Sequence, residues 1–208
     1  YRKVKDRDLK FQKEKSENEL KMLKAQLNPH FLFNSLNSIR ALVDIDPIKA
    51  KKSITTLSNL LRQSLVLGKE NLVTLESELG VAKSYLDLER VRFEERLKVE
   101  IDIADDCKKA RVPSMILQPL AENAIKYAIA VQEQGGAINV NVDKFGNDLL
   151  LELADNGPGA EIKNGNLYRE NGVGLANSRE RLQAMYGGDY SLVVANNTPK
   201  GVKRFSKC

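Results

Sequence analysis

The sequence contains no tryptophan, one histidine and two cysteines. Cys107 and Cys208 have no Cys or His near them at the spacing of a zinc site, which disfavours both a zinc centre and a disulfide scaffold. With His30 as the single histidine, a histidine-based triad around a cysteine nucleophile is also poorly supported. No apolar run approaches the roughly 18–20 residues that cross a bilayer, and no signal segment opens the sequence, so we expect this piece to be soluble.

The composition is that of a globular protein, and its charge is placed unevenly. Hydrophobic residues make up 42% and charged residues 29% of 208 residues, which disfavours wholesale disorder and allows one large or two modest domains. Residues 1–28 hold nine Lys or Arg against five Asp or Glu, an excess of four in a chain of net charge +5. Because both signs alternate, this segment predicts a solvated helical face. There are two alternative interpretations. The segment could contact phosphate or lipid head groups, or it could lie beside a membrane helix before Tyr1.

Two helices are expected in the first third of the chain. Between residues 5 and 43 there is no glycine and one proline, Pro29, and leucines recur at steps of three and four, which predicts one long helix. Asp46 and Pro47 supply the cap and the first-turn proline of a second helix, which ends at Gly68. The two apolar stripes cannot cover each other on all sides, so we expect a second copy to complete a four-helix bundle. The stripes consist of Leu32, Leu36, Ile39 and Val43, and of Ile54, Leu57, Leu61 and Leu65.

The rest of the chain mixes helices with strands. Thr74 caps a third helix, with Glu76 and Glu78 in its first turn, where carboxylates suit the helix dipole. Alternating apolar residues then predict strands, and further helices are expected at 114–130 and 174–186. The expected strands lie near 97–103, 138–142, 149–153, 190–195 and 201–206. This pattern predicts an α+β fold in which a two-layer α/β sandwich follows the helical hairpin, with the junction near residues 68–73.

Two glycine-containing segments carry the strongest chemical signal. Residues 155–159 read Asp-Asn-Gly-Pro-Gly and follow a predicted strand, and residues 171–175 read Asn-Gly-Val-Gly-Leu and open the last helix. Each alone is an ordinary turn signal. Together they supply a carboxylate that accepts from an amino group, glycines that admit a ligand, and a helix start suited to phosphate, which is typical of a nucleotide site. Neither the P-loop pattern nor the dinucleotide fingerprint is present.

A third segment, Gln118–Tyr127, predicts a core helix whose apolar members share one face. Glu122, Asn123 and Lys126 stand among these apolar residues, and a core helix alone does not explain them. Oxygen atoms of the first two are suited to a metal, and the ammonium group of the third is suited to a phosphate.

Residues 28–34 read Asn-Pro-His-Phe-Leu-Phe-Asn, and together with the three segments above they resemble the sensor histidine kinases, in particular their autolysis-regulator (LytS-like) branch. The resemblance covers most of the chain. It implies a dimerisation and histidine phosphoacceptor domain over residues 1–70 and a catalytic ATP-binding domain over residues 71–208, of the type shared with gyrase and MutL. It also implies ATP and Mg²⁺ as cofactors and a response-regulator protein as partner.

The same resemblance implies roles for individual residues. Asp155 would accept from the adenine amino group, Asn123 would hold Mg²⁺, and the phosphates would face Lys126 and Tyr127. The pocket and its lid would be shaped by Gly157, Gly159, Gly172, Gly174 and Leu175. Two departures stand out: Tyr127 occupies a place where many members of this branch have His, and Gly201-Val202 replaces the usual Gly-Thr before the last strand.

The residues around His30 predict its exposure independently. On a helical wheel His30 lies roughly 120–180° from the apolar residues that follow it, so it faces out above Pro29. Pro29 cannot donate to the carbonyl of Ala25 and bends a helix at its own turn. Judged from its position alone, a histidine beside a bundle core more often has a structural role. The segments typical of a nucleotide site make a phosphoacceptor role for His30 the favoured one. Phe31 stands where most histidine kinases have an acid, and Asn34, one turn on, is our candidate to orient the imidazole or a water.

These observations predict a protein-histidine kinase that moves the γ-phosphoryl group of Mg-ATP to His30. We expect a homodimer on the cytoplasmic side of the cell membrane, attached only through a segment before Tyr1, with no nucleic-acid partner. One alternative is an ATPase or Ser/Thr protein kinase of the same ATP-binding superfamily in which His30 is inert. The other is a non-catalytic coiled-coil scaffold.

Overall fold

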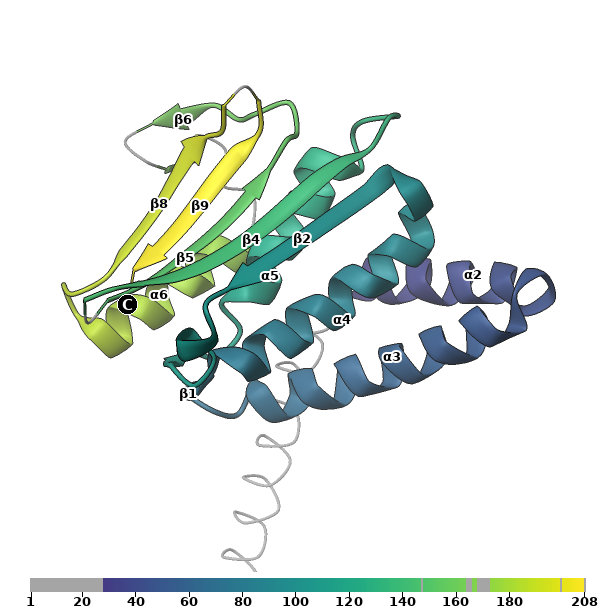
Figure 1. Cartoon of the computed structure of the whole chain (residues 1–208), viewed down its shortest axis with the longest axis horizontal. Helices are drawn as coiled ribbons and strands as arrows, with labels where there is room; N and C mark the ends of the chain where they lie inside the picture. Colours follow the sequence, from purple (N-terminus) through teal and green to yellow (C-terminus); the bar gives the residue numbers. More distant parts are fainter. Residues whose placement is uncertain (1–27, 147, 164–165, 168–172, 199, 208) are drawn as a thin grey trace, which may run out of the picture.

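The computed structural model describes residues 28–146, 148–163, 166–167, 173–198 and 200–207. The first part of the predicted long helix, residues 5–27, lies outside these ranges. Helices α2 (Pro29–Ile45) and α3 (Pro47–Leu67) form an antiparallel hairpin (Figure 1). As predicted, the Asp46 side chain caps α3, accepting from the backbone N–H of Lys49 at 2.9 Å, and the helix stops before Gly68. No helix within the described ranges is both long and apolar enough to span a bilayer.

The prediction of one helix bent at Pro29 is wrong, because α2 begins at that residue. Asn28 is extended, with φ −62° and ψ 107°, and its side chain accepts from the backbone N–H groups of His30 and Phe31. Proline at the first helical position loses no hydrogen bond that the helix needs, and its fixed φ suits that position. Asn28 and Pro29 therefore start helix α2.

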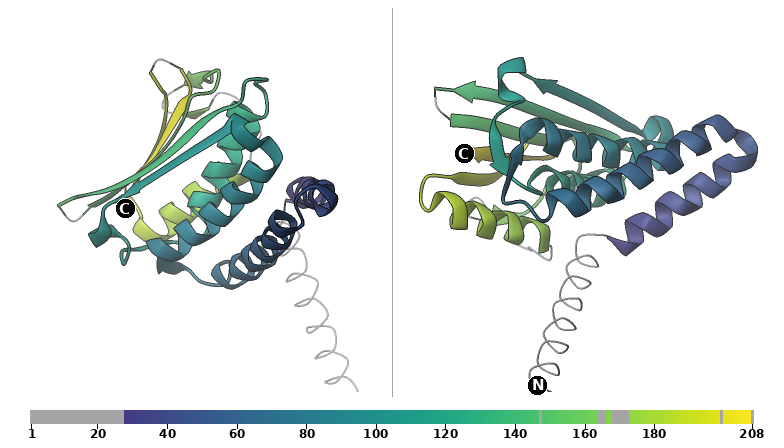
Figure 2. Two further views of the ribbon diagram at one scale, coloured as in Figure 1. Left: turned by 45° about the vertical axis from the view of Figure 1, so that its right-hand side comes forward. Right: turned by 90° about the horizontal axis from the view of Figure 1, so that it is seen from below.

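A five-stranded sheet, covered on one face by three helices, forms the second unit and confirms the predicted α+β fold (Figures 1 and 2). The helices are α4 (Leu75–Phe93), α5 (Leu117–Ala124) and α6 (Val173–Tyr186). The sheet order is β2-β4-β5-β9-β8, with β2 and β4 parallel and the other pairs antiparallel. The strands are β2 (Leu97–Ile103), β4 (Gly136–Phe145), β5 (Asp148–Asp155), β8 (Ser191–Asn196) and β9 (Val202–Lys207).

Several short elements connect these layers. A two-stranded sheet of β1 (Leu72–Thr74) and β3 (Arg111–Pro113), which the sequence did not predict, lies directly after the hairpin. The pair β6 (Ile162–Lys163) and β7 (Asn166–Leu167) follows β5. Short helices are η1 (Glu94–Arg96), η2 (Asp105–Cys107) and the π-helical η3 (Ile125–Ile129).

The main core lies between the sheet and its helices. Ile138, Val140 and Val142 of β4 alternate with polar residues and are all buried, as the period of a half-buried strand requires. Ile138 pairs with Asp155, so the register places this acidic residue at the end of β5, beside the start of β4. The sheet thereby places the carboxylate that we predict to bind adenine at the end of its central strand.

The hairpin packs against α4 and not against the sheet (Figure 2). Phe31 is buried, and its ring lies 4.8 Å from that of Tyr85 on α4, centroid to centroid. Part of the predicted apolar stripe remains open in the single chain, with Leu36, Val43 and Ile54 exposed by 53%, 49% and 53%. The face that packs on α4 therefore leaves a second apolar face of the hairpin uncovered.

Candidate nucleotide and phosphoacceptor site

The loop after β5 holds Asp155 in a defined orientation. Its side chain is buried, and Oδ1 accepts from the backbone N–H groups of Gly157 (3.1 Å) and Val202 (3.0 Å). Asn197 donates from Nδ2 to the backbone carbonyl of Asp155 over 3.0 Å. The neighbouring strand β9 and the turn before it therefore fix the carboxylate, and this support could not be read from residues 155–159 alone.

Two glycines are required by this close packing. A Cβ on Gly157 would collide with Ala128 of η3. The loop after β5 therefore lies directly against η3, the π-helical turn that follows α5. Gly201 has φ +108°, and a Cβ there would collide with the backbone carbonyl oxygen of Asp155. Only glycine adopts such a φ and leaves this space empty.

The helix that carries Asn123 changes its geometry within the predicted segment. Asn123 is half-buried near the end of α5, and the following turn is π-helical, with the N–H of Ala130 donating to the carbonyl of Ile125 at 2.9 Å. Lys126 and Tyr127 lie exposed on this turn, and Nζ of the lysine is 4.7 Å from the centre of the tyrosine ring. Single π turns are frequent at functional sites because they re-aim side chains.

Glu78 supports the start of α5, a role that the sequence did not predict. Its side chain is buried, and its carboxylate accepts from the backbone N–H groups of residues 115–117. Burial raises the pKa of Glu78, although these backbone hydrogen bonds and the charge of Arg181 act in the opposite direction. Arg181 of α6 also donates to the backbone carbonyl of Ser114 over 2.6 Å. Glu78 thus lies in the first turn of α4 as expected, but it caps a different helix.

His30 is exposed in the first turn of α2, as predicted. Nδ2 of Asn34 lies 3.3 Å from each of the two ring nitrogens of His30. The same amide group therefore lies within hydrogen-bond distance of both nitrogens of the ring. Phe31, in the place of the expected acid, is buried and anchors the turn.

Family models match the chain in two consecutive parts. Residues 18–97 match the model described as histidine kinase, and residues 108–206 match that of the histidine kinase-, DNA gyrase B- and HSP90-like ATPases. The chain belongs to the histidine kinases. The sensor histidine kinase YesM of Bacillus subtilis is 39% identical over 188 residues, which cover 90% of this chain and 32% of that protein. The sensor protein LytS of Staphylococcus saprophyticus is 38% identical over 184 residues, covering 85% and 31%. This chain therefore spans about a third of the length of the curated relatives it matches.

Solved structures agree on the fold of this histidine kinase. The histidine kinase domain of the Erythrobacter litoralis EL346 blue-light activated histidine kinase superposes with a TM-score of 0.52 at 14% identity, covering 91% of this chain and 90% of that one. The catalytic domain of the histidine kinase ThkA gives 0.52 at 14% identity, covering 65% and 92%. At this identity the similarity shows the fold alone.

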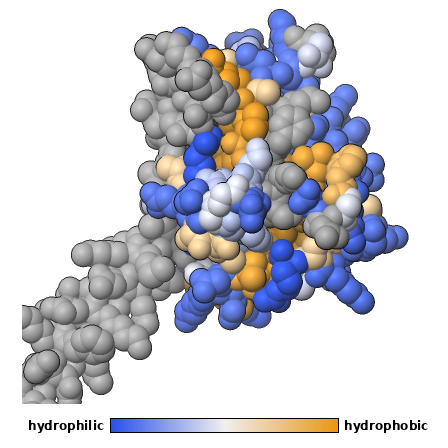
Figure 3. All heavy atoms as spheres, turned by 90° about the vertical axis from the view of Figure 1, so that its left-hand side faces the viewer, coloured by the Kyte–Doolittle hydropathy of each residue, from blue (hydrophilic) through white to orange (hydrophobic). Residues whose placement is uncertain are grey.

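The remaining predicted residues of this histidine kinase fall at the start of α6. Leu175 is buried, and Gly174 lies within the first turn of the helix. Gly172 lies outside the described residues. On the side of the molecule where α6 and β8 lie, apolar surface appears between hydrophilic patches (Figure 3).

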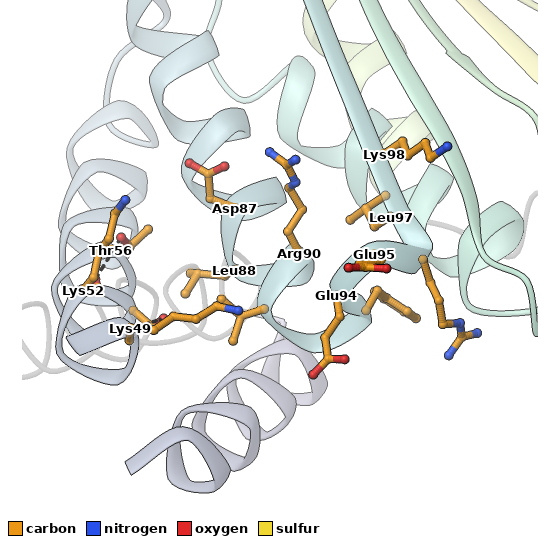
Figure 4. Close-up of a pocket in the computed structure, with 14 residues that line it drawn as sticks. Lys49, Lys52, Thr56, Asp87, Leu88, Arg90, Glu94, Glu95, Leu97 and Lys98 are labelled. Atoms are coloured by element: carbon orange, nitrogen blue, oxygen red, sulfur yellow. Dashed lines mark hydrogen bonds between the residues drawn. The ribbon is translucent and has the colours of Figure 1, made fainter. Parts of the chain in front are cut away.

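Two cavities differ in their relation to these residues. One of about 430 Å³ is lined by Gly159, Asn196, Asn197 and Gly201, so it adjoins the Asp155 loop. A larger one of about 1150 Å³ lies between α3, α4 and the start of β2, with Lys52, Arg90 and Lys98 among its lining (Figure 4). It contains none of the predicted site residues. The larger of these two cavities therefore does not coincide with the predicted site in this fold.

Proposed function

We propose that this chain is the kinase portion of a two-component sensor, which transfers the γ-phosphoryl group of ATP to His30 and then to an aspartate of a response-regulator protein. The observation that carries this proposal is the exposure of the only histidine, at the start of a helix, with its ring beside Asn34. In this proposal residues 1–70 form the dimerisation and phosphoacceptor domain and residues 71–208 the ATP-binding domain.

The site residues take the following roles in this proposal. Asp155 accepts a hydrogen bond from the adenine amino group, while Lys126 and Tyr127 face the phosphates. Asn123 holds Mg²⁺, since its half-buried amide oxygen is the hard ligand that this ion accepts beside ATP phosphates. When bound, the ion neutralises charge that develops during transfer. The pocket and its lid are shaped by Gly157, Gly159, Gly172, Gly174 and Leu175.

The transfer itself needs little activation of the acceptor. The lone pair of a ring nitrogen of His30 attacks the γ-phosphorus, a nitrogen–phosphorus bond forms, and the bond from the γ-phosphorus to the bridging oxygen breaks. ADP leaves with that electron pair, and the other ring nitrogen releases its proton to water. Asn34 orients the imidazole during this step, because its side chain adjoins both ring nitrogens.

The assembly and location follow from the same proposal. The exposed apolar face of the hairpin, including Leu36 and Ile54, is covered by a second copy of the chain. The basic opening segment lies on the cytoplasmic side of the membrane, where surplus Lys and Arg are favoured beside a membrane helix.

The chemistry of the phosphorylated product tests this function against its alternatives. The protein is incubated with Mg²⁺ and γ-labelled ATP, and the label is challenged with acid and with base. A phosphohistidine loses its label in acid and keeps it in base. Label that survives acid and is lost in base would indicate a Ser/Thr kinase, and ADP release without label would indicate an ATPase. Absence of nucleotide binding would indicate a scaffold.

A further inference from the structure

The connection between the hairpin and the second unit, residues 68–71, is bound by a turn of that unit. The hydroxyl group of Ser114 donates to the backbone carbonyl of Glu70 over 2.6 Å, and the backbone N–H of Ser114 donates to the carbonyl of Asn71 over 3.1 Å. Glu70 in turn donates its backbone N–H to the carbonyl of Leu67, at the end of α3, over 3.0 Å. Backbone groups of Glu70 therefore join the end of the hairpin to the turn at Ser114.

The same serine is bound from the other side by α6. Nη1 of Arg181 donates to the hydroxyl oxygen of Ser114 over 2.8 Å and to its backbone carbonyl oxygen over 2.6 Å. Ser114 is fully buried, and hydrogen bonds from a charged donor are stronger than those between neutral groups. Its hydroxyl group accepts from Arg181 while it donates to Glu70, so one side chain joins α6 to the connection. We call Arg181, Ser114 and Glu70 the α6 link.

The turn that contains Ser114 is held in a strained conformation. Met115, the next residue, has φ +58°, which residues other than glycine rarely adopt. The carboxylate of Glu78 accepts from the backbone N–H groups of residues 115–117, where α5 begins. Such a backbone conformation persists only where the surrounding contacts determine it. A displacement of Ser114 would therefore also displace the start of α5.

Both helices that meet at this turn carry residues that we assign to the nucleotide. Asn123 lies on α5, while α6 carries Gly174 in its first turn and Arg181 seven residues later. Seven residues make about two helical turns, or roughly 10 Å, so the helix passes a displacement from one of these positions to the other. The α6 link thus connects the nucleotide end of α6 with the end of the hairpin.

We propose that Arg181 is a positioning residue, which through Ser114 ties the nucleotide end of α6 to the connection with the hairpin. The proposal rests on the nucleotide site of the proposed function. In this role Arg181 contacts neither ATP nor His30. Because the coupling of two sites is reciprocal, a nucleotide that orders the start of α6 also tightens the connection, and a tight connection favours nucleotide binding.

The test follows backbone hydrogen exchange in the full chain, with and without Mg²⁺ and a non-hydrolysable ATP analogue. The amides to follow each donate to a backbone carbonyl, and they belong to Gly68, Lys69, Glu70 and Ser114. We expect saturating nucleotide to slow their exchange about fivefold in the wild type and to leave it unchanged in Arg181→Gln. A purely structural role of Arg181 would instead raise exchange equally with and without nucleotide.

A second variant, Ser114→Ala, removes the hydroxyl group and keeps the backbone groups of residue 114. We expect ATP affinity to fall about fivefold in Arg181→Gln and about threefold in Ser114→Ala. The double variant should bind ATP no more weakly than Arg181→Gln alone, because both substitutions break the same link.

Two control variants separate this coupling from a general loss of stability. Glu180→Gln, an exposed change on α6, should alter neither the exchange nor the affinity. Val142→Ala, a buried change on β4, lowers stability outside the link and should keep the full effect of nucleotide on exchange. Thermal unfolding of every variant shows which of them are destabilised.

The proposal is overturned if nucleotide slows exchange equally in Arg181→Gln and in the wild type, if it has no effect in the wild type, or if the losses of affinity add in the double variant. Should Arg181→Gln fail to fold, Ser114→Ala decides by a reduced effect of nucleotide on exchange. Phosphohistidine formation is measured separately on the wild type. Exchange coupling without phosphohistidine would refute the proposed function and support the link, whereas a labelled wild type without exchange coupling would do the reverse.

Discussion

Val202 donates its backbone N–H to the buried carboxyl group of Asp155 over 3.0 Å, although 47 positions separate the two residues. The strand after the last turn of the chain thus holds the residue that we assign to the adenine amino group. Gly201, directly before it, leaves room for this bond because it carries no side chain. The proposed nucleotide site therefore depends on β9 as much as on the loop that contains its glycines.

Asp155→Asn should weaken ATP binding far more than binding of a purine nucleotide without the exocyclic amine. The asparagine amide keeps an oxygen for the N–H of Val202, but its NH2 group would face the adenine amino group, so two donors would meet. An unsatisfied buried partner costs about 1–3 kcal/mol, roughly fivefold to 150-fold in affinity. Titration of both nucleotides measures the difference. Asp143→Asn, an exposed change on β4, is the control. Equal losses for both nucleotides would show that Asp155 does not recognise adenine.

Gly201→Ala should destabilise the protein by about 1–3 kcal/mol, because alanine at φ +108° is strained and its Cβ meets the Asp155 carbonyl. Gly188→Ala is the matched control, since a Cβ there meets nothing within 4 Å. Chemical denaturation of the two variants gives the comparison. Equal stabilities would contradict the close packing described for the loop.

Glu89→Gln should become more stable relative to the wild type as the pH rises. Burial raises the pKa of Glu89 above its usual 4.5, Arg92 acts in the opposite direction, and Glu122 adds to the rise. The folded state therefore holds this proton more tightly than the unfolded state, so the carboxyl group loses stability as pH increases from 4.5 through its folded pKa. Glutamine lacks this proton.

Urea denaturation of both proteins at several values between about pH 5 and pH 8 measures that difference in unfolding free energy. A constant difference across this range would show that the charge of Glu89 is equally favourable in both states. The Arg92 contact at 3.4 Å would then offset the burial completely.

Leu36→Gln with Ile54→Gln should weaken dimerisation without unfolding the chain. Both side chains are exposed by 53% in the single chain, and burial of a leucine-sized side chain contributes about 1.5–3 kcal/mol. We expect the dissociation constant to rise at least about tenfold in sedimentation equilibrium. Val131→Gln, which removes an apolar side chain exposed by 60% outside the hairpin, should change nothing. Unaltered association in the double variant would place the dimer interface elsewhere.

Features that depend on local chemistry were predictable from the sequence. Asp46 starts α3, Gly187 ends α6 with φ +60°, and the alternation at Ile138 and Val140 marks β4. At Pro29 the local signal was present in Asn28, the preferred cap before a first-turn proline, but the longer leucine periodicity suggested a continuous helix.

Features that join distant segments were not predictable. The carboxyl group of Glu78 finds its partners at residues 115–117, and nothing in its own helix indicates them. The same holds for the pairing of β1 with β3 and for the contact of Ser64 with Gln118. Each brings together groups whose spacing in the chain carries no periodic signal, so only the folded arrangement reveals them.

The most direct test of the central claim compares His30→Gln with the wild type after incubation with Mg²⁺ and γ-labelled ATP. Arg40→Gln, an exposed change on the same helix, is the control. We expect His30→Gln to carry no acid-labile label, with ATP affinity within about threefold of the wild type, since the proposed acceptor lies on the hairpin and the proposed nucleotide residues lie in the second unit. The Arg40 variant should be labelled normally. Label that persists in His30→Gln would show that another residue accepts the phosphoryl group and would contradict the account.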